Sequence, residues 1–162
     1  MTTLITISDI INIALLMATT IGVFAAFRQI YISNKQKRAD IILQLCNQFF
    51  QDKDMQDMYY KIEYSQFKYI VATFHTSEEE RQLDKLLGLF SNIGQLYQMG
   101  IIKNKDLEFI KYEFQVIYEY PDVQSYFQTL DRWFHSREIN HLKFQPFRDV
   151  GQIITNNNYQ QL

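Results

Sequence analysis

Residues 10–27, IINIALLMATTIGVFAAF, carry no charge and are bounded by Asp9 and Arg28. An uncharged apolar stretch of about 18 residues is typical of a transmembrane helix. At a rise of about 1.5 Å per residue it spans about 27 Å, close to the roughly 30 Å thickness of a hydrocarbon core. Apolar residues beyond both ends can supply the remaining length while Arg28 extends towards the headgroups. We therefore predict a transmembrane anchor over residues 1–32.

The basic residues near this run all lie on one side of it. None precedes it, and four follow it closely: Arg28, Lys35, Lys37 and Arg38. Positive charge beside a membrane span stays on the cytoplasmic side. We therefore expect a single-pass protein of the inner (cytoplasmic) membrane, with its N-terminus outside and its C-terminus in the cytoplasm. The four basic side chains either only set this topology or also face anionic lipid, at about 1 kcal/mol each.

Two other interpretations of the run have to be weighed. A secretory signal peptide needs a basic segment before the apolar run and a small-x-small cleavage site after it. Here the basic segment follows the run, and Phe27-Arg28-Gln29-Ile30 offers no such site. The other alternative is a buried core helix of a soluble protein, because Asn12, Thr19 and Thr20 dilute the apolar run.

Charge and cysteine content limit the partners. The chain has 16 Lys and Arg against 18 Asp and Glu, a net charge of −2. Because four of the basic residues lie beside the span, the rest of the chain is mildly acidic and lacks the basic face of a nucleic-acid-binding protein. A single cysteine, Cys46, can form no internal disulfide, which agrees with a reducing cytoplasm.

The rest of the chain has the pattern of an all-α protein. It contains only two prolines and five glycines, and its apolar residues recur mostly at spacings of three and four. We expect one cytosolic domain over residues 33–155, of a common domain size, and a disordered tail over residues 156–162. A helix over 33–51 continues from the span, and a bundle of about five more helices follows. These begin near Asp54, Ser77, Asn104, Asp122 and Pro146.

The helix that begins near Ser77 has the clearest signals. Ser77 and Glu80 have the spacing of a capping box, and Gly100 can end the helix in the left-handed conformation. A mostly apolar stripe runs between them: Leu83, Leu86, Leu87, Phe90, Ile93, Gly94 and Tyr97. Across the domain we expect the following residues in the core: Leu86, Leu87, Phe90, Ile110, Phe114, Phe127 and Leu130.

The spacing of apolar residues predicts two further helical segments whose apolar pattern is less regular. The helix over 33–51 should bury a face that includes Leu43, Cys46, Phe49 and Phe50. The helix that begins near Asp54 should continue, after a shift in its apolar phase, as far as Phe74.

The order of these elements can be compared with known families. The sequence predicts, in order, a membrane helix, a basic juxtamembrane helix and a helical body. The body contains two short stretches, Phe90-Ser91-Asn92-Ile93-Gly94-Gln95-Leu96-Tyr97 and Gly100-Ile101-Ile102. This arrangement resembles an uncharacterised family of small bacterial membrane-anchored helical proteins. The resemblance implies the architecture of a single span and a helical domain. It implies no activity and no catalytic residues.

No constellation of residues points to catalysis, a metal or a cofactor. Asp131 and His135 are four residues apart and could pair on one helix face, but no further ligand completes a zinc site. Cys46 has no base beside it and is expected to be a small core residue. The acidic run Glu78–Glu80 fits the first turn of a helix, where negative charge is favourable. Trp133 and Phe134 either anchor a partner or, as we expect, pack in the core.

Small residues recur every four positions within the apolar run. They are Ala14, Ala18, Gly22 and Ala26. Such a face lets two membrane helices approach closely, so we predict that it is a helix-association face and that the protein forms a homo-oligomer. Small residues are also common in membrane spans in general.

The leading functional hypothesis is a non-enzymatic, membrane-tethered helical domain that binds an unknown protein partner, or itself, on the cytoplasmic face. A second hypothesis is a small self-assembling membrane effector of a bacterial toxin or phage-defence system. An enzyme acting on lipid or another membrane substrate is a third hypothesis, which the missing catalytic constellation disfavours.

Overall fold

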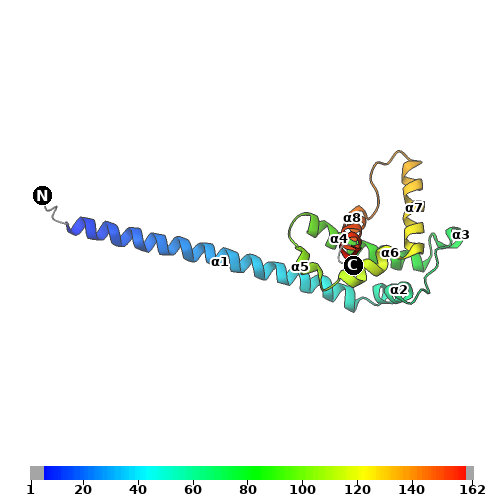
Figure 1. The fold of residues 1–162 in the computed structure, drawn as a ribbon, viewed down its shortest axis with the longest axis horizontal. Helices are drawn as coiled ribbons and strands as arrows, with labels where there is room; N and C mark the ends of the chain where they lie inside the picture. Colours follow the sequence, from blue (N-terminus) through cyan, green and yellow to red (C-terminus); the bar gives the residue numbers. More distant parts are fainter. Residues whose placement is uncertain (1–5, 160–162) are drawn as a thin grey trace. The chain divides into compact units, whose positions relative to one another are not determined.

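The computed structural model describes residues 6–159 of the chain. These residues form eight helices and no strand, which confirms the predicted all-α fold class (Figure 1). The chain divides into two compact units, Met1–Ile41 and Ile42–Leu162. The division falls inside one helix, so the first unit also includes part of the helix that we expected over 33–51.

Helix α1, Ile7–Gln51, is continuous. The expected helix over 33–51 is therefore confirmed as a direct continuation of the apolar run. The physical reason is local, since neither glycine nor proline occurs between residues 23 and 51 to interrupt the hydrogen-bond ladder.

Helix α2, Lys53–Glu63, begins slightly before the position predicted from Asp54. Its N-cap is Asp52, whose Oδ1 accepts a hydrogen bond of 3.2 Å from the backbone N of Met55. The prediction was wrong by one or two residues because both aspartates suit a helix start, and the side chain of Asp52 is the one that reaches the free backbone donor.

The segment after α2 does not continue as a helix as far as predicted. Only the short helix α3, Val71–Phe74, forms there. Phe67 and Phe74 are buried, whereas Ile70 is 59% exposed. The hydroxyl of Tyr120 donates to the carbonyl of Phe67 over 2.8 Å and holds the extended chain. Two buried rings and a long-range hydrogen bond therefore replace the expected helical turns.

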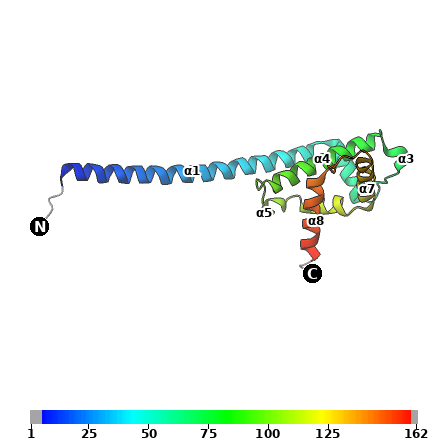
Figure 2. The same ribbon diagram turned by 90° about the horizontal axis from the view of Figure 1, so that it is seen from above.

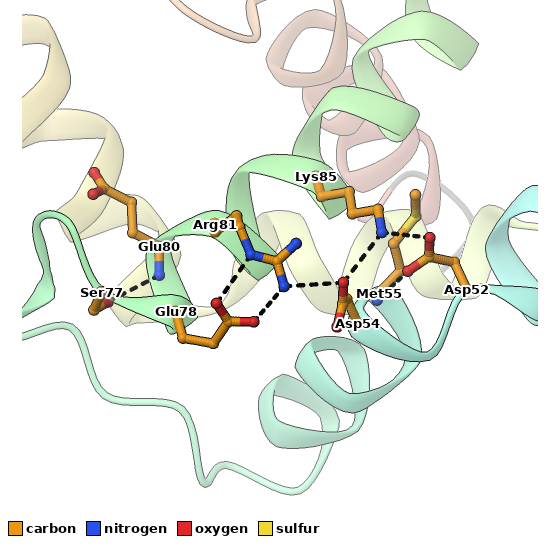
Figure 3. A network of polar contacts seen from close by, with 8 residues as sticks. All are labelled: Asp52, Asp54, Met55, Ser77, Glu78, Glu80, Arg81 and Lys85. Atoms are coloured by element: carbon orange, nitrogen blue, oxygen red, sulfur yellow. Dashed lines mark hydrogen bonds and ion pairs between the residues drawn. The ribbon is translucent and has the colours of Figure 1, made fainter.

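Helix α4, Glu78–Gln98, has the predicted ends. Ser77 Oγ accepts from the backbone N of Glu80 over 3.1 Å, and Gly100 takes a φ of +73° after the last turn. The capping box forms only in part. The carboxylate of Glu80 accepts from the backbone N of Thr76 instead of that of Ser77, and it points away from the polar contacts around Arg81 (Figure 3).

A polar network joins α2 to α4 (Figure 3). Lys85 Nζ lies 2.5 Å from Asp52 Oδ2 and 3.2 Å from Asp54 Oδ2. Arg81 donates to Asp54 over 3.1 Å and also to Glu78. Hydrogen bonds from Lys85 lower the pKa values of Asp52 and Asp54. Because these groups are near water, the network sets the pairing of the two helices more than it adds stability.

The expected fourth helix is two helices, α5, Asn104–Leu107, and α6, Lys111–Glu119. Asn104 does not act as the cap, because its Oδ1 accepts from the Tyr97 hydroxyl over 2.6 Å. Lys103 occupies the N-cap position, and its backbone N donates to the carboxylate of Asp106 over 2.9 Å.

Helices α7, Pro121–His135, and α8, Gln145–Tyr159, complete the fold. Pro121 and Pro146 both lie in first turns, where a missing N–H costs nothing. The predicted tail was to start at Asn156, but α8 continues to Tyr159 because each further helical residue adds one backbone hydrogen bond. Residues 160–162 of that tail lie outside the described residues.

The core of the second unit forms where α4, α6 and α8 meet. Helix α8 packs across α4 (Figure 2). Phe90 of α4 contacts Phe114 and Phe147, with ring centroids 4.9 and 6.0 Å apart, in the edge-on geometry that aromatic rings prefer. Six of the seven predicted core residues are buried: Leu86, Leu87, Phe90, Ile110, Phe114 and Phe127.

Several predictions of burial are wrong. Leu130 is only half-buried, and Trp133 is 46% exposed. On α1 the buried residues are Leu45 and Phe49, whereas Phe50 is 58% exposed. Phe50 points about 100° away from Phe49 around the helix, and at this place in α1 only Phe49 faces the core.

Leu43, also expected on the buried face of α1, is 59% exposed. Cys46 is half-buried, and this burial raises the pKa of its thiol. The thiol is therefore less ready to ionise than a free cysteine, as expected for a residue that packs beside the core.

Candidate functional site

The first candidate region is the apolar part of α1. It is long and apolar enough to cross a membrane by length and composition, and none of it is buried. It is the single helix of residues 6–159 with this property. Ala14, Ala18, Gly22 and Ala26 all lie in this continuous helix and are exposed. A Cβ added at Gly22 would meet no atom within 4 Å, so this position is open to another chain or to lipid.

Two polar residues of the same segment are satisfied within the helix. The hydroxyls of Thr19 and Thr20 each donate to the carbonyl four residues earlier, over 2.8 Å. Neither hydroxyl therefore needs water or a second chain to accept its proton.

The four basic residues that follow the apolar part lie on the same helix. Arg28, Lys35 and Lys37 are exposed, and Arg38 is half-buried. Three of the four predicted lipid-facing side chains are thus exposed.

The second candidate region is a pocket in the helical domain that we call the Trp133 pocket. Its volume is about 470 Å³. It is lined by His75, Thr76, Glu80, Thr129, Leu130, Trp133, Phe134 and Lys143. One wall is a single face of α7, because four of its residues follow one another at positions i, i+1, i+4 and i+5.

A second wall of the Trp133 pocket comes from the turn that precedes α4. Glu80 Oε1 lies 2.9 Å from His75 Nδ1, and its Oε2 accepts from the backbone N of Thr76 over 2.6 Å. His75 Nε2 lies 3.4 Å from the hydroxyl of Tyr69. One carboxylate thus fixes both residues of the turn.

This turn is strained. Thr76 has a φ of +69°, which is rare for a β-branched residue, and Phe144, next to Lys143 on the third wall, has a φ of +61°. Conformations of this kind cost about 1–3 kcal/mol and tend to occur at ligand sites. Both strained residues are in loops that border the same pocket.

Lys143 is held at the third wall by α4. Its Nζ lies 2.6 Å from Asp84 Oδ2, and the other oxygen of Asp84 accepts from the hydroxyl of Tyr126 over 2.7 Å. Burial, together with this hydrogen bond, raises the pKa of Tyr126. The phenol is therefore a permanent donor that helps to fix Asp84 and, through it, Lys143.

The residues that the sequence suggested for metal binding do not come together. Asp131 accepts two hydrogen bonds from Arg148, of 2.9 and 2.8 Å, so its carboxylate is engaged by a residue of α8. Within the described residues no group of three or more His, Cys, Asp and Glu side chains could hold a metal ion.

The Trp133 pocket was not predicted from the sequence. Trp133 and Leu130 were expected in the core, and Glu80 was expected only as part of a helix cap. The single signal in the sequence was the pair Trp133-Phe134, for which partner binding was the less favoured interpretation. His75 and Lys143 lie far apart in the chain, and no spacing rule connects them.

Comparisons with protein-family models, with curated proteins and with solved structures give no match to this chain. The resemblance to a family of small membrane-anchored proteins therefore remains a prediction from the sequence. The function has to be argued from the two regions described above.

Proposed function

We propose that the protein is a membrane-tethered helical domain that binds a protein partner on the cytoplasmic face. The observation that carries this proposal is the exposed apolar part of α1. Its large apolar side chains from Ile7 to Ile32 are 45–78% exposed. Burial of one such side chain is worth about 1.5–3 kcal/mol, so a surface of this size is stable only when lipid or protein covers it.

Lipid is the better cover for this segment. A core helix of a soluble protein is mostly buried by its own chain, and this one is not. The apolar residues surround the helix on all sides, as in a membrane span, and do not form one stripe, as on an amphipathic surface helix. The basic residues from Arg28 to Arg38 favour a cytoplasmic position for the domain that follows.

We expect the whole chain to fractionate with membranes, and a variant without residues 1–32 to be released from them. A fluorescent protein fused to the C-terminus should fluoresce, because it folds in the cytoplasm, and alkaline phosphatase at the same place should be inactive. Phosphatase activity would contradict the orientation. Solubility of the whole chain without detergent would instead make α1 a helix covered by protein.

The second hypothesis, a membrane effector that forms a pore, receives less support. A pore needs polar groups that face its lumen, yet the hydroxyls of Thr19 and Thr20 are bonded to their own helix. Self-association of the anchor is a separate matter, since it needs only close packing of helices.

We expect the anchor to self-associate through Ala14, Ala18, Gly22 and Ala26. Replacing Gly22 by Ile should weaken dimerisation several-fold in a membrane dimerisation reporter, because a branched side chain would separate the two backbones. Val23→Ile is the matched control, since it adds one methylene at a neighbouring position. Equal signals from both variants would show that the small residues play no part and that α1 is only an anchor.

A further inference from the structure

We propose that the Trp133 pocket binds a small aromatic carboxylate. This inference goes beyond the proposed protein interaction and does not depend on the membrane anchor, because every lining residue belongs to the unit Ile42–Leu162. The volume of about 470 Å³ lies within the range of about 300–1,000 Å³ that is usual for small-molecule sites.

The apolar wall favours a ring. Trp133 is 46% exposed, and its indole meets Phe134 edge-on with ring centroids 5.1 Å apart. Leu130 completes this wall in a half-buried position. Removal of this apolar surface from water by a ligand is favourable. A planar ligand can add edge-to-face or offset contacts with the two rings.

The polar groups favour an acceptor on the ligand. Each oxygen of Glu80 already accepts one hydrogen bond, from His75 and from Thr76, and each oxygen of Asp84 does so from Tyr126 and from Lys143. Each of these two carboxylates thus already accepts two hydrogen bonds from the protein. An ammonium group has three donors, and the contacts of Lys143 are one hydrogen bond to Asp84 and a position 4.8 Å above the ring of Phe144.

Lys143 therefore keeps donor capacity for a ligand, and a carboxylate is the acceptor that uses it best, because charge-assisted hydrogen bonds are the strong ones. Two arginines of the same region add positive charge. Arg137 lies 4.1 Å from the centre of the Trp133 ring, and Arg132 donates to the hydroxyl of Thr129 over 3.2 Å. Neither arginine lines the pocket, and a cationic ligand would meet the ammonium of Lys143 as a like charge.

The test uses three ligands of nearly equal shape: hydrocinnamate, phenylpropanol and phenylpropylamine. The full-length chain is placed in lipid nanodiscs whose scaffold lacks tryptophan, and affinities are measured by ligand-observed NMR titration. Trp133 is the single tryptophan of the chain, so its emission reports on the pocket directly. We expect the acid to bind at least about tenfold more tightly than the amine and to change this emission, since a charged pair adds to the shared contacts of the ring.

Two variants locate the interaction. Lys143→Gln should lower the affinity for the acid about tenfold and leave that for the alcohol within about twofold, because only the charge-assisted bond is lost. Lys61→Gln is the matched control, since Lys61 lies 2.6 Å from Glu79 with 36% of its side chain exposed, against 34% for Lys143. Trp133→Leu should weaken the binding of all three ligands.

Three results would overturn the proposal. They are no saturable binding of hydrocinnamate, an affinity for the amine or the alcohol within about twofold of that for the acid, and an equal effect of Lys61→Gln and Lys143→Gln. The second result would point to recognition of an apolar group alone, such as a side chain of a protein partner. Trp133 is 46% exposed and Lys143 is half-buried, so neither variant replaces a residue of the fully buried core.

Discussion

Replacing Phe90 by alanine should remove most of the stability of the helical domain. Phe90 is fully buried, and its ring lies between those of Phe49, Phe114 and Phe147, with centroids 5.6, 4.9 and 6.0 Å away. Truncation of a buried phenylalanine costs about 3–5 kcal/mol, whereas a whole domain is stable by only about 5–15 kcal/mol. Urea unfolding of the full chain, followed by far-ultraviolet circular dichroism, measures the change.

Phe50→Ala is the control for this variant. Phe50 is 58% exposed, although its ring centroid is 5.0 Å from that of Phe49. Its removal should cost about 1 kcal/mol or less, since only one partner ring is lost and no cavity is left. If the two variants unfolded at the same urea concentration, the aromatic cluster would not be the centre of the core.

The parts of the fold that the sequence predicted correctly are those with a local cause. The cap at Ser77 depends on a hydrogen bond to a residue three positions away, and the end of α4 depends on the left-handed φ that Gly100 tolerates. The apolar stripe of α4 is equally local, because the helical period alone places Leu86, Leu87 and Phe90 on one side.

The failures have causes that are distant in the sequence. Phe67 and Phe74 are buried with only the short helix α3 between them, because Tyr120, 53 residues further along the chain, holds the backbone at Phe67. Trp133 follows the apolar periodicity of α7, but it lies in the last turns of that helix. There its side chain lines a pocket and does not pack against another helix. No pattern within α7 could reveal which element stands opposite.

The candidate site was the least predictable part for the same reason. His75, Glu80 and Lys143 come from a turn, a helix and a loop that only the complete fold brings to one pocket. Their chemistry also depends on contacts that are not visible in the sequence. Glu80 is engaged by Thr76, whose strained backbone could not be predicted from its residue type. The long apolar helix, by contrast, was visible in the sequence, because such a helix is recognised by composition and length alone.

Replacement of two different glycines of α4 by alanine should change the stability of the domain in opposite directions. A Cβ built on Gly94 would overlap the carbonyl group of Pro146, at the point where α8 crosses α4. Backbone on both sides leaves nothing flexible to move, so Gly94→Ala should destabilise the domain by about 3 kcal/mol, the upper end of the usual cost of overpacking. A Cβ on Gly88 would meet no atom within 4 Å.

Gly88→Ala should therefore stabilise the domain, by about 0.5–1 kcal/mol, because alanine loses less backbone entropy than glycine in a helix interior. The two variants make the same chemical change in the same helix, so helix propensity cancels in their difference and only the contact with α8 remains. Thermal unfolding of both variants beside the parent chain measures this difference. Equal shifts in the midpoint temperature would mean that α8 does not cross α4 at Gly94. The position of Phe147 in the core would then be wrong as well.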